Sequence, residues 1–240
     1  MLYLAHRGIW RGGDVENTLS AFDRVVDRLS PNLGLLHGFE CDVRQCDLED
    51  PTSWVVFHDD TWDRLTSQKG ALYFPSRPML LLQDGVIAYM PTLIDFCNWA
   101  KTISGCSITI NIEIKHGSPE GVAYLLSQLC SVSSDSIKWI VSSFNTDILR
   151  TVACVAPTIA MSGLLQSVND LSTLNAFPGL AFIAMRSDRI TPDFCTELKQ
   201  RDIGLGIYFN TLDAYKTWKN SGVVLDGLCA VFTEEGCDGH

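Results

Sequence analysis

Short apolar runs alternate with longer amphipathic segments along most of the chain. Apolar runs of this length are typical of strands buried on both faces of a parallel sheet, and apolar residues three or four positions apart are typical of the connecting helices. We predict strands at residues 2–5, 38–43, 107–114, 138–143, 158–164, 180–185, 203–209 and 227–233. The predicted helices occupy residues 18–29, 91–101, 119–129, 146–152, 168–174, 192–201 and 212–220.

This alternation predicts an α/β protein. Eight strands in 240 residues favour a (β/α)8 TIM barrel formed by a single domain, residues 1–240, and a doubly wound parallel sheet is the main alternative. Only 16 residues lead from Asp42 to His58, which is too short for a helical crossover, so residues 54–57 are predicted to return antiparallel. Residues 60–90 lack a clear period, and we expect them to form a small insertion after His58.

The charge of the chain restricts its partners. The 18 basic and 28 acidic residues give a formal net charge of −10, which argues against nucleic acid or an anionic membrane surface as a partner. An apolar fraction of 46% with 19% charged residues is typical of a folded chain. A small anionic substrate would therefore need a local cluster of positive charge.

The cysteines and the first residues of the chain indicate in which cellular compartment the protein lies. The nine cysteines include no CxxC pair, which argues against a zinc ribbon and is typical of buried thiols in a reducing compartment. The start of the chain lacks the basic and long apolar regions of a signal peptide, so we expect a cytoplasmic protein. Residues 151–169 carry no charge, but Pro157 and Gly163 interrupt them, and we predict no membrane insertion.

Polar residues end several of the predicted strands, where the catalytic residues of a barrel lie. Glu40 and Asp42 are two positions apart, so strand alternation directs both carboxylates to the same side. In the segment ITINIEIK, residues 108–115, the polar Asn111, Glu113 and Lys115 share one face. Burying such charges is costly unless they are paired or bind a metal. We therefore expect these side chains to form one site.

The residue types in this site indicate a chemistry. Three carboxylates form an all-oxygen site that suits Mg²⁺ or Ca²⁺ better than zinc. Two histidines supply a general acid and a general base near neutral pH, and two basic residues neutralise a phosphate. The carboxylates are Glu40, Asp42 and Glu113, the histidines are His6 and His58, and the basic residues are Arg7 and Lys115.

Several spaced motifs extend this interpretation. AHRG at 5–8, ENTLSAF at 16–22, FECDV at 39–43, HDDTWDRLT at 58–66 and IEIK at 112–115 occur in this order, followed by SSFNTDIL at 142–149. Together they resemble the signatures of the glycerophosphodiester phosphodiesterase family. The resemblance spans most of the chain and is densest in its first half.

This resemblance implies a TIM barrel with an insertion after the HD motif. It implies metal-dependent hydrolysis of a small glycerophosphodiester to an alcohol and glycerol 3-phosphate. At the matching positions, the resemblance implies the same roles as the residue chemistry. His6 and His58 are the acid/base pair, Glu40, Asp42 and Glu113 are the metal ligands, and Arg7 and Lys115 bind the phosphate.

One segment departs from the family's sequence pattern, and two residues of the ENTLSAF motif are expected to have structural roles. The segment IYFN at 207–210 lacks the tryptophan usual in the family, so we expect Tyr208 or Phe209 to supply an aromatic wall. Asn17 suits the N-cap of the following helix, and we expect Glu16 to tether that helix.

Two alternatives to this activity remain at this stage. A related barrel that cleaves lysophospholipids would need an exposed apolar lip, for which Phe74, residues 79–82 and Tyr89 are candidates. A binding barrel without catalysis would be favoured by the loss of a ligand or a histidine, and none of these residues is missing from the motifs.

Overall fold

A computed structural model gives the fold of the chain and describes residues 2–10, 15–29, 36–65, 70, 79–81, 87–174, 177, 179–209 and 229–233. One sheet contains the strands β1 (Leu2–His6), β2 (Gly38–Gln45), β3 (Trp54–Val56), β6 (Ile108–His116), β7 (Ile137–Ser143), β8 (Ala160–Leu164), β9 (Leu180–Arg186), β10 (Gly204–Phe209) and β11 (Cys229–Thr233). A separate antiparallel pair joins β4 (Met79–Leu81) and β5 (Ile87–Tyr89). The α-helices are α1 (Leu19–Arg28), α2 (Leu93–Ala100), α3 (Pro119–Ser131), α4 (Thr146–Val155) and α5 (Pro192–Gln200).

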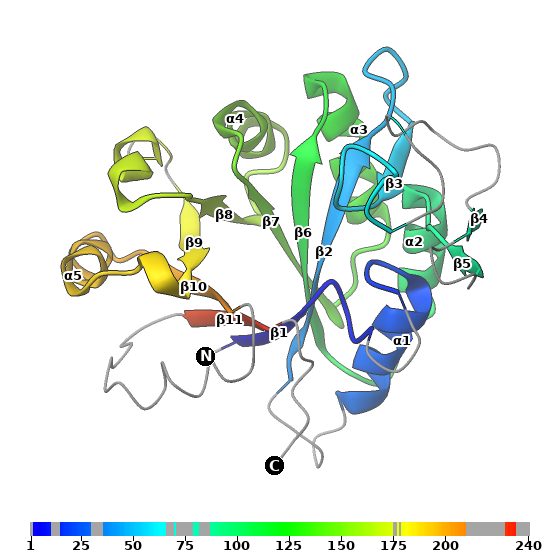
Figure 1. Cartoon of the computed structure of the whole chain (residues 1–240), viewed down its shortest axis with the longest axis horizontal. Coiled ribbons are helices and arrows are strands. Elements are labelled where there is room, and N and C mark those ends of the chain that lie inside the picture. Colours follow the sequence, from blue (N-terminus) through cyan, green and yellow to red (C-terminus); the bar gives the residue numbers. More distant parts are fainter. Residues whose placement is uncertain are drawn as a thin grey trace.

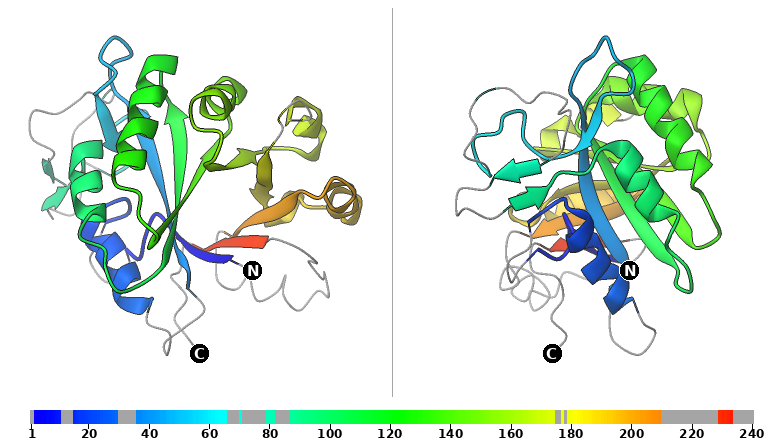
Figure 2. Two further views of the ribbon diagram at one scale, coloured as in Figure 1. Left: turned by 180° about the vertical axis from the view of Figure 1, so that it is seen from behind. Right: turned by 90° about the vertical axis from the view of Figure 1, so that its right-hand side faces the viewer.

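The large sheet is mostly parallel and strongly curled (Figure 1). Its strands follow the order β1, β11, β10, β9, β8, β7, β6, β2 and β3, and β1 also pairs with β2. Figure 2 shows the helices on the outside of the curl. This arrangement confirms the predicted α/β class. All eight predicted strands are present, and β3 returns antiparallel to β2 as the short connection requires.

The two faces of the sheet carry separate apolar cores. Between the sheet and the helices, Phe22 of α1 stacks on Phe39 of β2 with ring centroids 4.2 Å apart, and Phe96 of α2 packs edge-on against Phe22. All three rings are fully buried, and each stabilises the fold by roughly 1.5–3 kcal/mol relative to exposure. Inside the curl, a smaller cluster consists of strand side chains: Leu4, Ile140, Leu164, Phe182 and Ala184. A doubly wound sheet would have helices on this face as well.

Some helix predictions need correction. The segment at 168–174 forms the 3-10 helix η1 (Val168–Leu174), which begins in the i to i+3 register because the turn before it lets the Asp170 amide donate to the Ser167 carbonyl. Thr18 is the N-cap of α1 and accepts a hydrogen bond from the Ala21 amide, so the prediction that Asn17 caps this helix was wrong. The side chain of Asn17 is engaged elsewhere, as described below.

Other predictions fall partly or wholly outside the described residues. These include the helix at 212–220, Asn210 and most of the insertion at 60–90. Of the apolar lip, only Tyr89 has a described side chain, and it is 67% exposed. In the part of the chain that the structure covers, no helix is long and apolar enough to cross a membrane.

Gly38 begins β2, the strand that carries two of the candidate carboxylates, and it provides a test of this packing. A Cβ atom at this position would lie 1.7 Å from the backbone oxygen of Thr109 on β6. We expect Gly38→Ala to lower the free energy of unfolding by about 3 kcal/mol, the upper end of overpacking costs, because backbone atoms must separate to admit the methyl group. Urea unfolding measures this change.

Gly105 is the matched control for this substitution. Its φ is +75°, but a Cβ atom added there would meet no other atom within 4 Å. Gly105→Ala should therefore cost only the strain of a left-handed residue, about 1–2 kcal/mol. Equal losses for the two variants would contradict the close approach of β2 and β6 at Gly38.

Candidate active site

The turn after β1 brings the first two candidate residues to the rim of the sheet. His6 is the last residue of β1, and Arg7 follows it with a φ of 61°. The Arg7 amide donates to Glu40 Oε2 at 3.1 Å, and the Arg7 carbonyl accepts from the Asn17 amide at 3.0 Å. Asn17 also has a positive φ, 59°. A left-handed residue costs roughly 1–2 kcal/mol, which these hydrogen bonds offset.

Three carboxylates converge beside this turn. Glu40 and Asp42 lie on β2, and the register of the sheet pairs Asp42 with Glu113 on β6. Glu40, Asp42 and Glu113 are all buried, and each offers an oxygen atom within 4.8 Å of those of the other two. Strand alternation thus does what the sequence predicts, because every second residue of neighbouring parallel strands faces the interior of the curl.

Two basic side chains and one amide compensate the charge of Asp42. Lys115 Nζ lies 3.0 Å from Asp42 Oδ1, and Arg7 Nε lies 3.1 Å from Asp42 Oδ2. The Asn17 side chain donates to Asp42 Oδ2 at 2.8 Å and accepts from the Asp42 amide at 3.1 Å. Lys115 also contacts Glu113. Asp42 is therefore the best-compensated carboxylate of the three.

The three carboxylates differ in pKa as a result. Burial alone would raise the pKa of Asp42, but the positive charges of Lys115 and Arg7 outweigh it and hold that pKa below its usual value. Burial, followed by repulsion from Asp42 and Glu113, raises the pKa of Glu40 well above its usual value. Burial and Asp42 raise the pKa of Glu113 to about 7 despite its contact with Lys115. Glu40 and Glu113 therefore hold a negative charge less readily than an exposed carboxyl, and a bound cation would favour their charged forms.

The donor set fits a hard divalent cation. Carboxylate oxygen is the ligand that Mg²⁺ and Ca²⁺ prefer, and all candidate donors are of this type. Among the described residues, the buried Glu40 Oε1 has no hydrogen-bond partner. The amide of Asn111, which is paired in register with Glu40, has none either. A buried polar atom without a partner is costly, and an ion with its bound waters would satisfy these groups.

His58 is held in place by a hydrogen bond that continues into a chain of ion pairs. Its Nδ1 lies 2.5 Å from Asp59 Oδ1, and Asp59 Oδ2 lies 2.5 Å from Arg64 Nε. Arg64 continues to Glu16 at 2.5 Å, and Glu16 also accepts from Arg7 at 2.8 Å. Because an ionised carboxylate only accepts hydrogen bonds, Asp59 requires the proton of the neutral ring on Nδ1. Nε2 of His58 is then the nitrogen available for proton transfer.

His6 lies on the same side of the cavity as His58 and is uncharged at neutral pH. Burial, followed by the charge of Arg7, lowers the pKa of His6 to about 3. Burial likewise lowers the pKa of His58. The ring of Tyr208 on β10 lies edge-on to His6 with centroids 5.9 Å apart. Neutral imidazoles accept protons, so either ring can act as a general base, and the ring that acts as the acid must first take up a proton.

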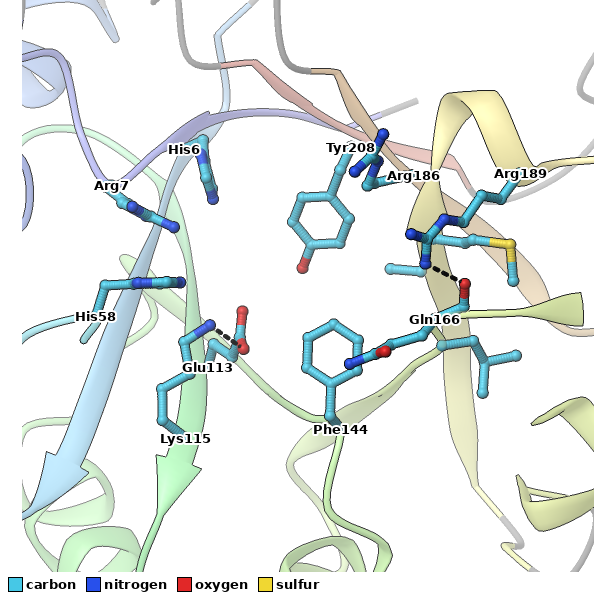
Figure 3. Close-up of a pocket in the computed structure, with 13 residues that line it drawn as sticks. His6, Arg7, His58, Glu113, Lys115, Phe144, Gln166, Arg186, Arg189 and Tyr208 are labelled. Atoms are coloured by element: carbon cyan, nitrogen blue, oxygen red, sulfur yellow. Dashed lines mark hydrogen bonds and ion pairs between the residues drawn. The ribbon is translucent and has the colours of Figure 1, made fainter. Parts of the chain in front are cut away.

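These side chains surround a cavity of about 400 Å³, which is large enough for a small organic molecule (Figure 3). His6, Arg7, His58, Glu113 and Lys115 line one side of it. Figure 3 shows Arg186, Arg189 and Gln166 on the opposite side, with Tyr208 and Phe144 between the two groups. Five of the seven residues expected from the sequence thus line one cavity, and the other two, Glu40 and Asp42, contact the lining residues Arg7 and Lys115.

The structure adds residues that the sequence analysis missed or placed differently. Asn17 binds Asp42 instead of capping a helix, and Glu16 connects Arg7 with Arg64. Phe144 and Arg186 line the cavity from the ends of β7 and β9. The strand-end rule used for the other site residues would have found these two. Tyr208 supplies the expected aromatic wall, whereas Phe209 is buried in the outer core.

Comparisons with known proteins bear on the fold. No protein-family model matches the sequence, and no curated protein matches it significantly. Among solved structures, a phosphodiesterase from Oleispira antarctica in complex with the product sn-glycerol 3-phosphate is 20% identical, with a TM-score of 0.73 over 98% of this chain and 93% of that chain.

Two further solved structures agree with this similarity. A glycerophosphodiester phosphodiesterase from Agrobacterium tumefaciens is 18% identical, with a TM-score of 0.70 over 98% of this chain and 96% of that one. Another from Parabacteroides distasonis is 19% identical, with a TM-score of 0.68 over 97% and 92%. The resemblance seen in the motifs is therefore confirmed in structure: this chain has the fold of glycerophosphodiester phosphodiesterases over nearly its whole length.

Proposed function

We propose that the chain is a metal-dependent phosphodiesterase that hydrolyses glycerophosphodiesters to an alcohol and glycerol 3-phosphate. One observation carries this proposal: two histidines, two basic side chains and Glu113 line a single cavity at the ends of the parallel strands, and Glu113 clusters with the buried Glu40 and Asp42. The solved structures with the same fold include glycerophosphodiester phosphodiesterases, and one of them holds sn-glycerol 3-phosphate as product.

The proposal includes the architecture expected from the sequence. We infer a closed (β/α)8 barrel formed by residues 1–240 as a single domain, with residues 60–90 as an insertion at the rim. The pairing of β1 with both β11 and β2 supports closure of the sheet. A cytoplasmic location and a small-molecule substrate, without a nucleic-acid partner or membrane insertion, belong to the same proposal.

Each polar residue at the cavity has a role in this reaction. Arg7 and Lys115 bind the phosphoryl oxygens and stabilise the charge that develops on them. One histidine takes a proton from the attacking oxygen, and the other gives a proton to the departing alkoxide. The attacking oxygen belongs to water or to the glycerol 2-hydroxyl, and in the second case water must then open the cyclic phosphate to give glycerol 3-phosphate. We assign His6 and His58 to these two roles as a pair. Asp59 orients His58 through the hydrogen bond to Nδ1.

Glu40, Asp42 and Glu113 would hold Mg²⁺ or Ca²⁺. When bound, such an ion polarises a phosphoryl oxygen and orients the substrate. The clustered acidic oxygens support this assignment, and so does Glu40 Oε1, which has no hydrogen-bond partner within the described part of the chain.

An assay with and without a chelator tests the function. We expect the protein to release alcohol from glycerophosphocholine, to lose this activity in excess EDTA and to regain it with Mg²⁺ or Ca²⁺. Lysophosphatidylcholine, assayed in parallel, distinguishes the lysophospholipid-cleaving alternative. Full activity in EDTA would contradict the metal requirement, and binding of glycerophosphocholine without turnover would indicate a binding protein instead.

Ion binding should also stabilise the fold, because an ion that binds only the folded state shifts the unfolding equilibrium. At an ion concentration of about 100 Kd the stabilisation is about 2.7 kcal/mol, which corresponds to a rise in Tm of roughly 5–10 °C for a chain of this size. We expect Glu113→Gln to remove this rise. Glu120→Gln, at an exposed position in the first turn of α3, is the matched control and should retain it.

Separate substitutions of the two histidines test the division of proton transfer. We expect His6→Ala and His58→Ala each to lower kcat by roughly 10²-fold or more, the usual scale of general acid or base catalysis, with the ion-induced rise in Tm retained. A nitrophenyl ester has a good leaving group that needs no acid, so it should rescue only the variant that lacks the acid.

The exposed His37, at the opposite end of β2, is the matched control, and His37→Ala should keep full activity. Equal rescue of both variants by the nitrophenyl ester, or rescue of neither, would contradict a division into one acid and one base.

A further inference from the structure

The cavity carries a second group of positive charges that the proposed chemistry does not use. Arg186 ends β9, and Arg189 follows in the short 3-10 helix η2 (Ser187–Arg189). Both line the cavity on the side away from the two histidines (Figure 3). Since the formal net charge of the chain is −10, this group is a local reversal of sign.

The two arginines are only partly neutralised. Arg186 forms an ion pair with Asp188, with its Nη2 2.5 Å from Asp188 Oδ2. The side chains of Arg186 and Asp188 are 47% and 57% exposed, and such exposed pairs contribute little free energy, so a ligand can compete for this arginine. Arg189 donates to the backbone carbonyl of Gln166, which carries no net charge. Among the described residues, two positive charges therefore face one carboxylate at this end of the cavity.

The position of the two arginines indicates that they face the alcohol half of the substrate and not its glycerol half. The scissile phosphate belongs with Arg7 and Lys115, beside the histidines. Glycerol carries no charge, so the glycerol half of a glycerophosphodiester has nothing for a second cationic group to bind. Guanidinium groups bind phosphate and carboxylate in a planar, bidentate geometry. A cationic headgroup such as choline would meet repulsion here, so we expect glycerophosphocholine to be hydrolysed but to bind more weakly than a diester with an anionic alcohol.

We propose that Arg186 and Arg189 form a subsite for an anionic group on the alcohol, so that the preferred substrates are glycerophosphodiesters whose alcohol carries a further phosphate or carboxylate. This inference rests on the proposed function for the placement of the scissile phosphate. Phe144 and Tyr208 line the cavity between the two charged groups and contact the uncharged middle of the alcohol.

Two matched pairs of ligands test the subsite by binding alone. Glycerophosphoinositol 4-phosphate differs from glycerophosphoinositol by one phosphate, and glycerophosphoserine differs from glycerophosphoethanolamine by one carboxylate. Titration calorimetry in EDTA measures their affinities without turnover. We expect the phosphorylated member to bind at least tenfold more tightly than its partner, which corresponds to about 1.4 kcal/mol. The same direction in the second pair extends the subsite to carboxylates, and an effect in the first pair alone assigns it to phosphate.

Substitutions connect this preference to the arginines. We expect Arg189→Gln and Arg186→Gln each to reduce the ratio of affinities in the phosphate pair to about threefold or less. Asp188→Asn removes the competing carboxylate and should raise the ratio two- to fivefold. Arg201→Ala removes an exposed arginine at the end of α5, whose guanidinium pairs with Glu197, and is the matched control that keeps the ratio unchanged.

Equal affinities within both pairs, a preference that survives both arginine substitutions, or tightest binding of glycerophosphocholine would overturn the subsite. Hydrolysis of the same compounds with Mg²⁺ tests the proposed function separately. Turnover without a phosphate preference rejects the subsite alone. A phosphate preference that depends on the arginines, without turnover, rejects the hydrolase and retains the subsite.

Discussion

The mutual repulsion of three buried carboxylates is the constraint around which this end of the sheet is built. Glu40, Asp42 and Glu113 lie on two adjacent strands, out of bulk water, and each has an oxygen within 4.8 Å of those of the other two. A fold tolerates such a cluster only if neighbouring charges and hydrogen bonds compensate the free energy lost when the carboxylates leave water. Arg7 and Lys115 supply charge, and Asn17 supplies two hydrogen bonds.

This compensation explains the unusual backbone beside the cluster. Arg7 and Asn17 both adopt left-handed conformations, and they hydrogen-bond to each other through the backbone. In this geometry the Arg7 amide reaches Glu40 while its guanidinium reaches Asp42 and Glu16. A regular continuation of β1 would direct these groups elsewhere. The strain is therefore local and is matched by charge-assisted hydrogen bonds, which are the stronger kind.

Strand alternation made much of the fold and site predictable. Apolar runs located the eight strands, and residues two apart on β2 and β6 identified the carboxylates because parallel strands place such positions on one face. What failed depends on contacts remote in sequence. Asparagine is a residue type that commonly caps helices, and only the approach of β2 brings Asp42 to the side-chain amide of Asn17. The 3-10 form of η1 and the cavity position of Arg189 likewise depend on packing and turn geometry that periodicity does not encode.

The position of Glu16 limits which loop replacements this protein can tolerate. Its carboxylate is shared by Arg7, next to His6, and Arg64, in the loop that carries His58. His6 ends β1 and His58 lies in the loop after β3, yet the segments that support them share this one acceptor. If the loop around residues 58–65 were replaced and Arg64 lost, Glu16 would pair with Arg7 alone. The side chains of Glu16 and Arg7 could then move away from their present positions. The rim loops are therefore not independent modules, and a graft from another barrel must bring the residues on both sides of Glu16 together.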